Sequence, residues 1–412
     1  MAEQSQRGRE AGEAKAHLGS IGEGSASRRS HFDARIASSS PAMAPWRISS
    51  YFMAKRHRPG RGAARLFAHV EDVLVAATGE DAFEIVFAVA AALLLDRTRR
   101  DIAVRIAAVA RSHRALDVKA PRRTPGELLE RVAGLIAKAV SSAPSELEAL
   151  DAIFEALVPR VAKSDKGQFF TPRHVVDFVV TALDVRAGER VADPSCGSGA
   201  FLSRAWREPR VQGEGVDIDA RAVRVARLLA CAAGRGPECV TLGDGLRRGD
   251  VASFDVIATN PPFAGASPPL GFEVERVVRR PERDALFLER ALTLLVPGGR
   301  LGIVLPYNKV SADAFAPLRA WLVARARVLA VVALPRETFL PHTAQRTVAL
   351  FAKKRARPLA DGERPDERVW LGVSERSGKA SSGEPLALPL AHDLGEVLSE
   401  LAPFLAREGF SR

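Results

Sequence analysis

The 412-residue sequence has little of what several large protein classes depend on. Its 3 cysteines, Cys196, Cys231 and Cys239, are too few and too irregularly spaced for a disulfide framework or a zinc site, which favours a reducing compartment. Its longest apolar stretch, Ile85 to Leu95, is well short of the ~20 residues that a membrane-spanning helix needs. The first residues lack the charged-then-apolar layout of a secretory signal. These absences predict a soluble, cytoplasmic protein without a metal site.

The charge of the chain is strongly unbalanced. It has 60 Lys and Arg against 49 Asp and Glu, a formal net charge of +11 at pH 7, which suits a partner made of phosphates. The sequence is also rich in Arg and Ala and poor in Lys and Tyr, as chains from GC-rich genomes often are, so charge alone does not decide for a nucleic acid. With 47% apolar residues, the chain can build an apolar core and about two to three domains.

The first part of the chain divides into two regions. Residues 1–45 are rich in Ser, Gly and Ala and have no apolar period, which predicts a disordered segment. Residues 46–163 have helical periodicity, and both Thr124–Glu127 and Ser145–Glu148 have a capping-box layout before an apolar series. We therefore expect an all-helical N-terminal domain.

Residues 164–356 have a different pattern, in which short apolar runs rich in β-formers alternate with amphipathic helices. The expected strands are Arg190–Asp193, Val211–Asp217, Val240–Leu242, Asp255–Thr259, Leu301–Pro306, Val328–Leu334 and Thr347–Ala352. This alternation predicts an α/β fold with a doubly wound, Rossmann-like parallel sheet. Only Pro335–Arg346 separates the last two strands, which permits an antiparallel last strand. Residues 357–412 suggest a linker and one short C-terminal helix.

A Gly-rich turn follows the first expected strand, which ends at Asp193. The residues of this turn are Cys196, Gly197, Ser198 and Gly199, and a helix follows. The glycines let a backbone approach a ligand closely, and the start of the helix presents N–H groups. The third glycine of the dinucleotide fingerprint is absent, as is the Gly-Lys-[Ser/Thr] of a P-loop. An acidic residue beside such a turn suits a ligand with a cationic ammonium better than a pyrophosphate.

Two further strands end in acidic residues. Asp217 closes the second expected strand, where a carboxylate can hold ribose hydroxyls, and Asp244 follows the third, where it could accept from an adenine amine. Taken singly, each aspartate is more often a helix cap or a turn residue. Their order and spacing after Asp193 predict an adenosyl site.

The fourth expected strand runs directly into Asn260-Pro261-Pro262-Phe263. An amine attached to an aromatic ring is a poor nucleophile because its lone pair is delocalised. The side-chain oxygen of Asn260 and the carbonyl of Pro261 could bind both N–H groups and draw the nitrogen toward tetrahedral geometry, and Phe263 could stack on the base. A purely structural interpretation, a rigid turn with Phe263 in the core, accounts for the two prolines. It does not account for the position of these four residues beside the strand ends where the adenosyl site is expected.

The order of Gly167–Pro172, Asp193–Leu202 and Asn260–Phe263 resembles the N6-adenine DNA methyltransferases, especially the modification subunits of type I restriction–modification systems. The resemblance implies a class I fold that uses S-adenosyl-L-methionine, and a target adenine flipped out of double-stranded DNA. It gives catalytic roles to Asn260, Pro261, Pro262 and Phe263.

The resemblance also implies a set of cofactor contacts. The segment expected to close over the methionine end of the cofactor is Gln168, Phe169, Phe170, Thr171 and Pro172. The residues expected to line the cofactor are Asp193, Cys196, Gly197, Ser198 and Gly199, with Asp217 on the ribose and Asp244 on the adenine amine. Thr171-Pro172 also has the layout of an N-cap and a first-turn proline for the following helix.

Single-chain relatives with this motif order have a recognition domain after the sheet, whereas few residues follow Ala352 here. The resemblance therefore implies a separate specificity subunit, and leaves a restriction subunit open. The segment after Asn260–Phe263 contains Arg276, Arg279, Arg280 and Arg283. These arginines could neutralise DNA phosphates, or they could belong to a solvated charged loop.

Three alternatives remain at this point. Protein-glutamine methyltransferases and RNA guanine-N2 methyltransferases share Asn-Pro-Pro-[Phe/Tyr] but lack a segment like Gly167–Pro172. A catalytically silent DNA-binding subunit is disfavoured because Asp217, Asn260 and Phe263 are all present.

Overall fold

The computed structural model describes residues 74, 76–161, 171–247, 253–263, 265, 269–383, 386 and 391–411. All of them lie in the compact unit Lys55–Arg412. The expected disordered segment 1–45, and Gln168, Phe169 and Phe170, lie outside the described residues. None of the helices in the described part is long and apolar enough to cross a membrane.

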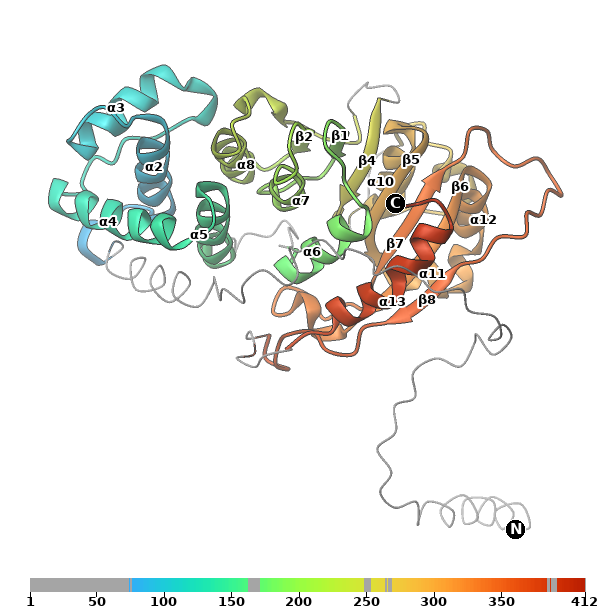
Figure 1. Cartoon of the computed structure of the whole chain (residues 1–412). Helices are drawn as coiled ribbons and strands as arrows, with labels where there is room; N and C mark the ends of the chain where they lie inside the picture. The colour runs from blue at the N-terminus through green and yellow to red at the C-terminus, as the bar shows by residue number, and fades with distance from the viewer. Residues whose placement is uncertain are drawn as a thin grey trace, which may run out of the picture. The chain divides into compact units, whose positions relative to one another are not determined.

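The described part of the expected N-terminal domain, residues 74 and 76–161, is helical. Its helices are α2 (Ala82–Leu95), α3 (Ile102–Ser112), α4 (Gly126–Ser142) and α5 (Glu146–Val161), with the short 3-10 helix η1 (Arg114–Leu116) after α3 (Figure 1). Asp81 caps α2 by accepting from the backbone N–H of Phe83 at 2.9 Å. Because α2 is apolar on every side and almost completely buried, it forms the centre of this domain.

The two expected capping boxes have different outcomes. The Ser145 hydroxyl accepts from the backbone N–H of Glu148 at 3.2 Å, so this N-terminal cap is confirmed. The cap expected at Thr124 is wrong. Helix α4 has no side-chain cap, and the Thr124 hydroxyl instead donates to the Glu80 carboxylate at 2.6 Å. A local sequence pattern cannot show that Glu80, 44 positions away, binds the Thr124 hydroxyl in place of the helix N-terminus.

The sheet has eight strands in the order β3-β2-β1-β4-β5-β7-β6-β8 (Figure 1). Its strands are β1 (Arg190–Asp193), β2 (Gln212–Asp217), β3 (Val240–Leu242), β4 (Phe254–Thr259), β5 (Leu295–Pro306), β6 (Ala326–Leu334), β7 (Thr347–Lys354) and β8 (Trp370–Val373). Strand β7 is antiparallel to both neighbours and all other pairs are parallel. A parallel pair needs a crossover of about a dozen residues or more, usually a helix, and only the short η4 (Arg336–Phe339) lies between β6 and β7.

The C-terminal part of the chain completes this domain instead of forming only a linker and a helix. Strand β8 pairs with β6, and helix α13 (Leu394–Arg407) packs on helix α6 (Arg173–Ala182). The sequence analysis missed strand β8, although Trp370, Leu371 and Val373 are apolar, because this run is short and follows a charged, Pro-rich stretch.

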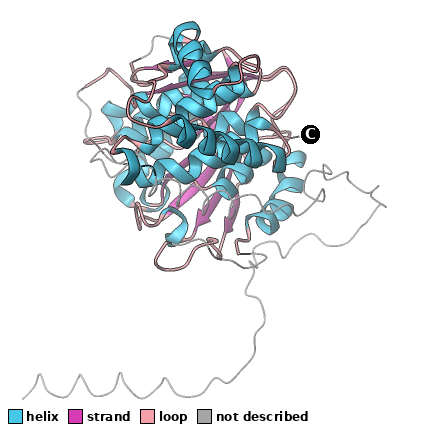
Figure 2. Cartoon of the chain, turned by 90° about the vertical axis from the view of Figure 1, so that its left-hand side faces the viewer, coloured by secondary structure: helices cyan, strands magenta, loops and turns pink. Residues whose placement is uncertain are grey.

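Helices lie against the sheet, as Figure 2 shows. Alternate strand residues enter two apolar clusters: Val191 and Val256 belong to one, Ala192 and Ile257 to the other. The first cluster also receives α6, α7 (Ala200–Ala205), α8 (Ala220–Ala232), α13 and the N-terminal helices. The second receives α9 (Val274–Val277), α10 (Arg283–Leu294) and α12 (Ala316–Arg325). The remaining short elements are η2 (Pro237–Cys239), α11 (Asn308–Ser311) and η3 (Asp313–Phe315).

Arg224 on α8 joins the helical domain to the sheet domain. Its guanidinium donates two hydrogen bonds of 2.8 Å to the Glu84 carboxylate on α2 and lies over the Phe87 ring at 4.5 Å. Burial alone would raise the pKa of Glu84, but the hydrogen bonds and charge of Arg224 hold that pKa below its ordinary value.

We expect Arg224→Ala to lower the free energy of unfolding by about 3 kcal/mol, because it leaves the Glu84 carboxylate in the interface without its main partner. The matched control is Arg97→Ala, which removes an exposed two-pronged pair with Glu146. This control should cost at most about 1 kcal/mol. Urea denaturation of both variants measures the difference, and equal losses would contradict the role of Arg224.

Candidate active site

The candidate site lies where the carboxyl ends of neighbouring parallel strands meet. Strands β2, β1 and β4 are adjacent, so the turns that follow Asp217, Asp193 and Thr259 converge on one edge of the sheet. Ligands bind outside this edge in open α/β sheets. The topology therefore brings Asn260–Phe263 close to the Gly-rich turn Pro194–Gly199 after β1, which we call the cofactor turn because the sequence predicts cofactor contacts there.

Asp193 is almost completely buried at the end of β1. Its Oδ1 accepts from the Thr259 hydroxyl at 2.7 Å and from the backbone N–H of Ser195 at 3.1 Å. Burial raises the pKa of this carboxyl to about 7, against the lowering effect of these two hydrogen bonds, and the nearby Asp217 raises it further. A cationic ligand group would favour the ionised form.

The Gly-rich turn after β1 is fixed by backbone hydrogen bonds. The N–H of Gly197, at φ 51°, donates to Asp217 Oδ2 at 2.8 Å, and the N–H of Cys196 donates to the carbonyl of Val216 at 3.0 Å. A Cβ at Gly197 would meet nothing within 4 Å, so this part of the turn borders open space. Gly199, at φ 85°, lets α8 approach, because a Cβ there would lie 3.0 Å from the Cβ of Ala226.

Asp217 and Asp244 lie at the expected edge but already have partners. Asp217 accepts from the backbone N–H of Asp219, in the turn after β2, and from that of Gly197, in the turn after β1. Asp244 accepts from Arg283 at 3.0 Å. Of the arginines for which phosphate contact and a solvated loop were both open, Arg283 does neither in this structure, because its guanidinium turns back to the sheet edge. The neighbouring arginines are exposed: Arg276, Arg279 and Arg280.

Asn260 follows β4 directly. Its Nδ2 donates to the Thr171 hydroxyl at 2.9 Å. In this orientation its Oδ1 is buried and has no hydrogen-bond partner among the described residues. Thr171 was expected to cap α6, which lacks a side-chain cap, so the hydroxyl serves the Asn260 amide instead. An oriented acceptor without a partner is the arrangement that would bind an incoming N–H group.

Phe263 is 2% exposed and lies edge-on to Phe339, with ring centroids 5.7 Å apart. The structure places its ring in the core, as the structural interpretation of the tetrapeptide required. Phe339 belongs to η4, between β6 and β7, and the sequence analysis missed it. The one sequence signal for Phe339 is its position shortly after β6, a strand that ends at the same edge of the sheet as β4.

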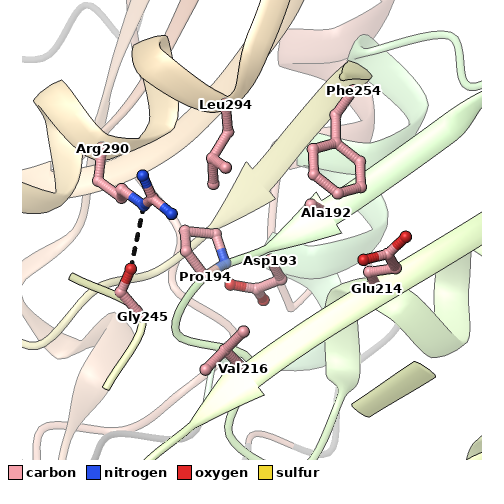
Figure 3. A pocket seen from close by; sticks show the side chains of 9 residues that line it. All are labelled: Ala192, Asp193, Pro194, Glu214, Val216, Gly245, Phe254, Arg290 and Leu294. Carbon is pink, nitrogen blue, oxygen red and sulfur yellow. Dashed lines mark hydrogen bonds between the residues drawn. The ribbon is translucent and has the colours of Figure 1, made fainter. Parts of the chain in front are cut away.

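A small hollow lies on the α10 side of the sheet, below the cofactor turn (Figure 3). Its lining residues are Ala192, Asp193, Pro194, Glu214, Val216, Gly245, Phe254, Arg290 and Leu294. Arg290 donates to the carbonyl of Gly245 at 3.1 Å. No residue of the Asn260–Phe263 tetrapeptide lines the hollow, so we assign it to packing under the turn and not to the substrate.

The sequence analysis also missed the role of Lys309, which follows β5 at the same edge. Its side chain is buried, lies 3.3 Å from Asp284, pairs with Glu282 and lies over the Phe315 ring at 4.1 Å. Burial raises the pKa of Asp284 to about 7, although the Lys309 charge lowers it. A spacing pattern cannot reveal this cluster, because its members come from three separate elements.

The fold and this edge define an α/β protein with an open, mostly parallel sheet, which carries an amide acceptor beside a Gly-rich turn. The N-6 DNA Methylase family model matches residues 146–382, more than half of the chain. The chain belongs to this family.

Relatives of the chain include methylase subunits of restriction enzymes and other methyltransferases. The Type I restriction enzyme EcoEI methylase subunit of Escherichia coli is 26% identical over 269 residues, 60% of this chain and 53% of that protein. Type II methyltransferase M.TthHB8I of Thermus thermophilus is 29% identical over 54% of this chain and 55% of its own length. The Ribosomal RNA small subunit methyltransferase C of Chromohalobacter salexigens is 36% identical over 36% of this chain and 39% of its own. The chain spans about half the length of the first type I relatives.

Solved structures share the fold. The type I restriction-modification system methyltransferase subunit from Streptococcus thermophilus superposes with a TM-score of 0.53 at 18% identity over 88% of each chain. A protein from a study of the assembly of the type I R-M system gives a TM-score of 0.58 at 20% identity over 86% of each chain. These identities show a common fold.

We expect Gly245→Ala to displace the cofactor turn, because its Cβ would lie 1.9 Å from the carbonyl oxygen of Pro194. Overpacking of this kind typically costs about 1–3 kcal/mol. Gly243→Ala is the matched control, since its Cβ would lie 3.9 Å from Val216, an ordinary contact. Thermal unfolding of both variants measures the effect. A loss for Gly243→Ala as large as that for Gly245→Ala would show that the approach of the two turns is not the constraint.

Proposed function

We propose that this chain transfers the methyl group of S-adenosyl-L-methionine to the N6 amine of an adenine in DNA, as the modification subunit of a restriction–modification system. One observation carries the proposal: the buried Oδ1 of Asn260 lacks a hydrogen-bond partner among the described residues, at the carboxyl end of β4 and beside the cofactor turn. The match covers only about half of the length of the type I relatives. The activity, the DNA substrate and the partners of this chain are therefore proposed and not carried over from them.

The residues at the edge fit S-adenosyl-L-methionine. When bound, the cofactor supplies a methyl group on a positively charged sulfur. Asp193 suits its ammonium group, and the open space beside Gly197 gives room against the backbone of the turn. Asp217 lies at the end of β2, where a carboxylate can reach ribose hydroxyls while it holds the turn. Asp244 can reach an adenine amine only if its contact with Arg283 changes or is shared.

Asn260 would bind the target amine. Its Oδ1 and the Pro261 carbonyl accept the two N–H groups, which draws the nitrogen lone pair out of conjugation with the ring. Thr171 holds the Asn260 amide in the orientation that leaves Oδ1 available. The two prolines stiffen the turn, so that positioning contributes most of the rate.

Stacking of Phe263 on the adenine remains a proposal that requires a rearrangement. The ring is buried against Phe339, so a base can reach its face only if the two rings separate or if the base binds between them. Stacking on an aromatic side chain typically contributes about 1–3 kcal/mol per base, which can offset the loss of this edge-on contact.

We propose that a separate specificity subunit reads the DNA sequence. The support is the similarity of the chain to methylase subunits of type I restriction enzymes, and its shared fold with a protein from a study of type I R-M complex assembly. The exposed arginines Arg276, Arg279 and Arg280 are candidates to contact DNA phosphates. A restriction subunit is not assigned.

We expect Asn260→Ala to abolish methylation while the affinity for S-adenosyl-L-methionine changes little, because the removed amide binds the target and not the cofactor. Methylation-aware sequencing of DNA from cells that express the chain with its genomic neighbours measures activity, and calorimetry measures the cofactor. Loss of cofactor binding would contradict the assigned role. Methylation of ribosomal RNA, with none of DNA, would replace DNA as the substrate.

We expect the affinity for S-adenosyl-L-methionine to fall as the pH drops below about 7. The pKa of Asp193 is raised to about 7, so below that pH the carboxyl is mostly protonated and must lose its proton to pair with an ammonium. The limiting slope is about tenfold per pH unit. Calorimetry between about pH 5.5 and 7.5 tests it. Asp193→Asn should flatten the slope, and a slope that persists in this variant would point to another group.

A further inference from the structure

We propose that Thr259 is a positioning residue: its buried hydroxyl joins the end of β4, next to Asn260, to the Asp193 carboxylate and the Ser195 hydroxyl of the cofactor turn. The proposal rests on the proposed function for its effect on turnover. Its structural part, that one hydroxyl links the two halves of the site and stabilises the Asp193 carboxylate, can be tested without any ligand.

The contacts of Thr259 are short and enclosed. The residue is completely buried, and its Oγ1 lies 2.7 Å from Asp193 Oδ1 and 2.8 Å from Ser195 Oγ. The backbone N–H of Ser195 donates to the same Asp193 oxygen at 3.1 Å. The three residues therefore form a closed triangle of hydrogen bonds between two strands that are neighbours in the sheet.

The chemistry of a hydroxyl fixes the direction of these bonds. When Asp193 is ionised its oxygens can only accept, so the single O–H proton of Thr259 goes to Asp193. The Ser195 hydroxyl must then donate to Thr259 Oγ1. Each bond polarises the next, so the chain from Ser195 through Thr259 stabilises the negative charge on Asp193. Valine at position 259 keeps the shape of the side chain but can neither donate nor accept.

The position of Thr259 in the chain gives this triangle its functional meaning. Asn260 is the next residue, and its amide is held from the other side by Thr171. The pairing of β1 with β4 brings the cofactor turn close to the amide acceptor, and we infer that the Thr259 contact fixes their separation more finely. A displacement of about 1 Å between reacting groups can lower a rate by about a hundredfold.

Thr347 offers a matched control. It is also completely buried, and it pairs with Pro306 and Leu334, which end β5 and β6, so it lies at the same edge of the sheet. Its hydroxyl has no hydrogen-bond partner among the described residues. Thr347→Val therefore reproduces the change of a buried threonine to valine without the loss of a contact to Asp193.

The first experiment compares urea denaturation of the full chain carrying Thr259→Val, Thr259→Ser or Thr347→Val across about pH 5.5 to 8. The Thr259 hydroxyl stabilises the ionised form of Asp193, so Thr259→Val should lose more stability above pH 7 than below it. In an Asp193→Asn background, the loss of stability caused by Thr259→Val should no longer depend on pH. Thr259→Ser keeps the hydroxyl, so its stability should follow the wild-type pH profile. A loss with the same pH profile as that of Thr347→Val would overturn the proposal.

The second experiment measures turnover in the full chain co-expressed with its genomic neighbours. Thr259→Val should lower kcat by about 10- to 100-fold, whereas Thr259→Ser and Thr347→Val should stay close to wild type. A serine variant as slow as the valine variant would show that the methyl group, and not the hydroxyl, matters. If the wild-type chain methylates no DNA, the proposed function fails, while the denaturation profiles still decide whether Thr259 holds Asp193.

Discussion

The arrangement of the site depends on the pairing of β1 with β4, which the hydrogen bond between Thr259 and Asp193 joins at its carboxyl end. The two residues lie 66 positions apart and become neighbours only because β1 and β4 are adjacent in the sheet. The order β3-β2-β1-β4-β5 places the switch in strand order between β1 and β4, where a crevice for a ligand forms. A different strand order would leave the Gly-rich turn and Asn260 intact as motifs but separate them in space.

The sequence predicted the parts of this arrangement that local patterns encode. The bounds of β1 and β3 agree with their apolar runs, and the antiparallel β7 agrees with the absence of a crossover helix before it. The partners of polar side chains could not be predicted. Thr171 has the pattern of a helix cap, yet it bonds to Asn260, which is 89 positions away. Such contacts depend on tertiary packing, which overrides the local preference of a residue for a cap.

The positive charge of the chain is a weaker indication of DNA binding than it first suggests. Several arginines serve the interior: Arg224 fastens the helical domain, and Arg300 bonds to the carbonyl of Leu183 and to Glu189. Arg283 turns back to Asp244. Arg276, Arg279 and Arg280, which follow Asn260–Phe263, remain exposed. They are therefore a more specific indication of a phosphate-binding surface than the net charge of +11.

Two polar groups at the site carry an energetic cost. The Oδ1 of Asn260 is buried without a partner among the described residues, which typically costs about 1–3 kcal/mol, and burial raises the pKa of Asp193 to about 7. An N–H donor would remove the first cost and a cation the second. A target amine and a cofactor with an ammonium group are complementary to these two groups, one on each side of Thr259. The polarity of the site, more than its shape, therefore favours a ligand with a cationic group next to Asp193 and an N–H donor next to Asn260.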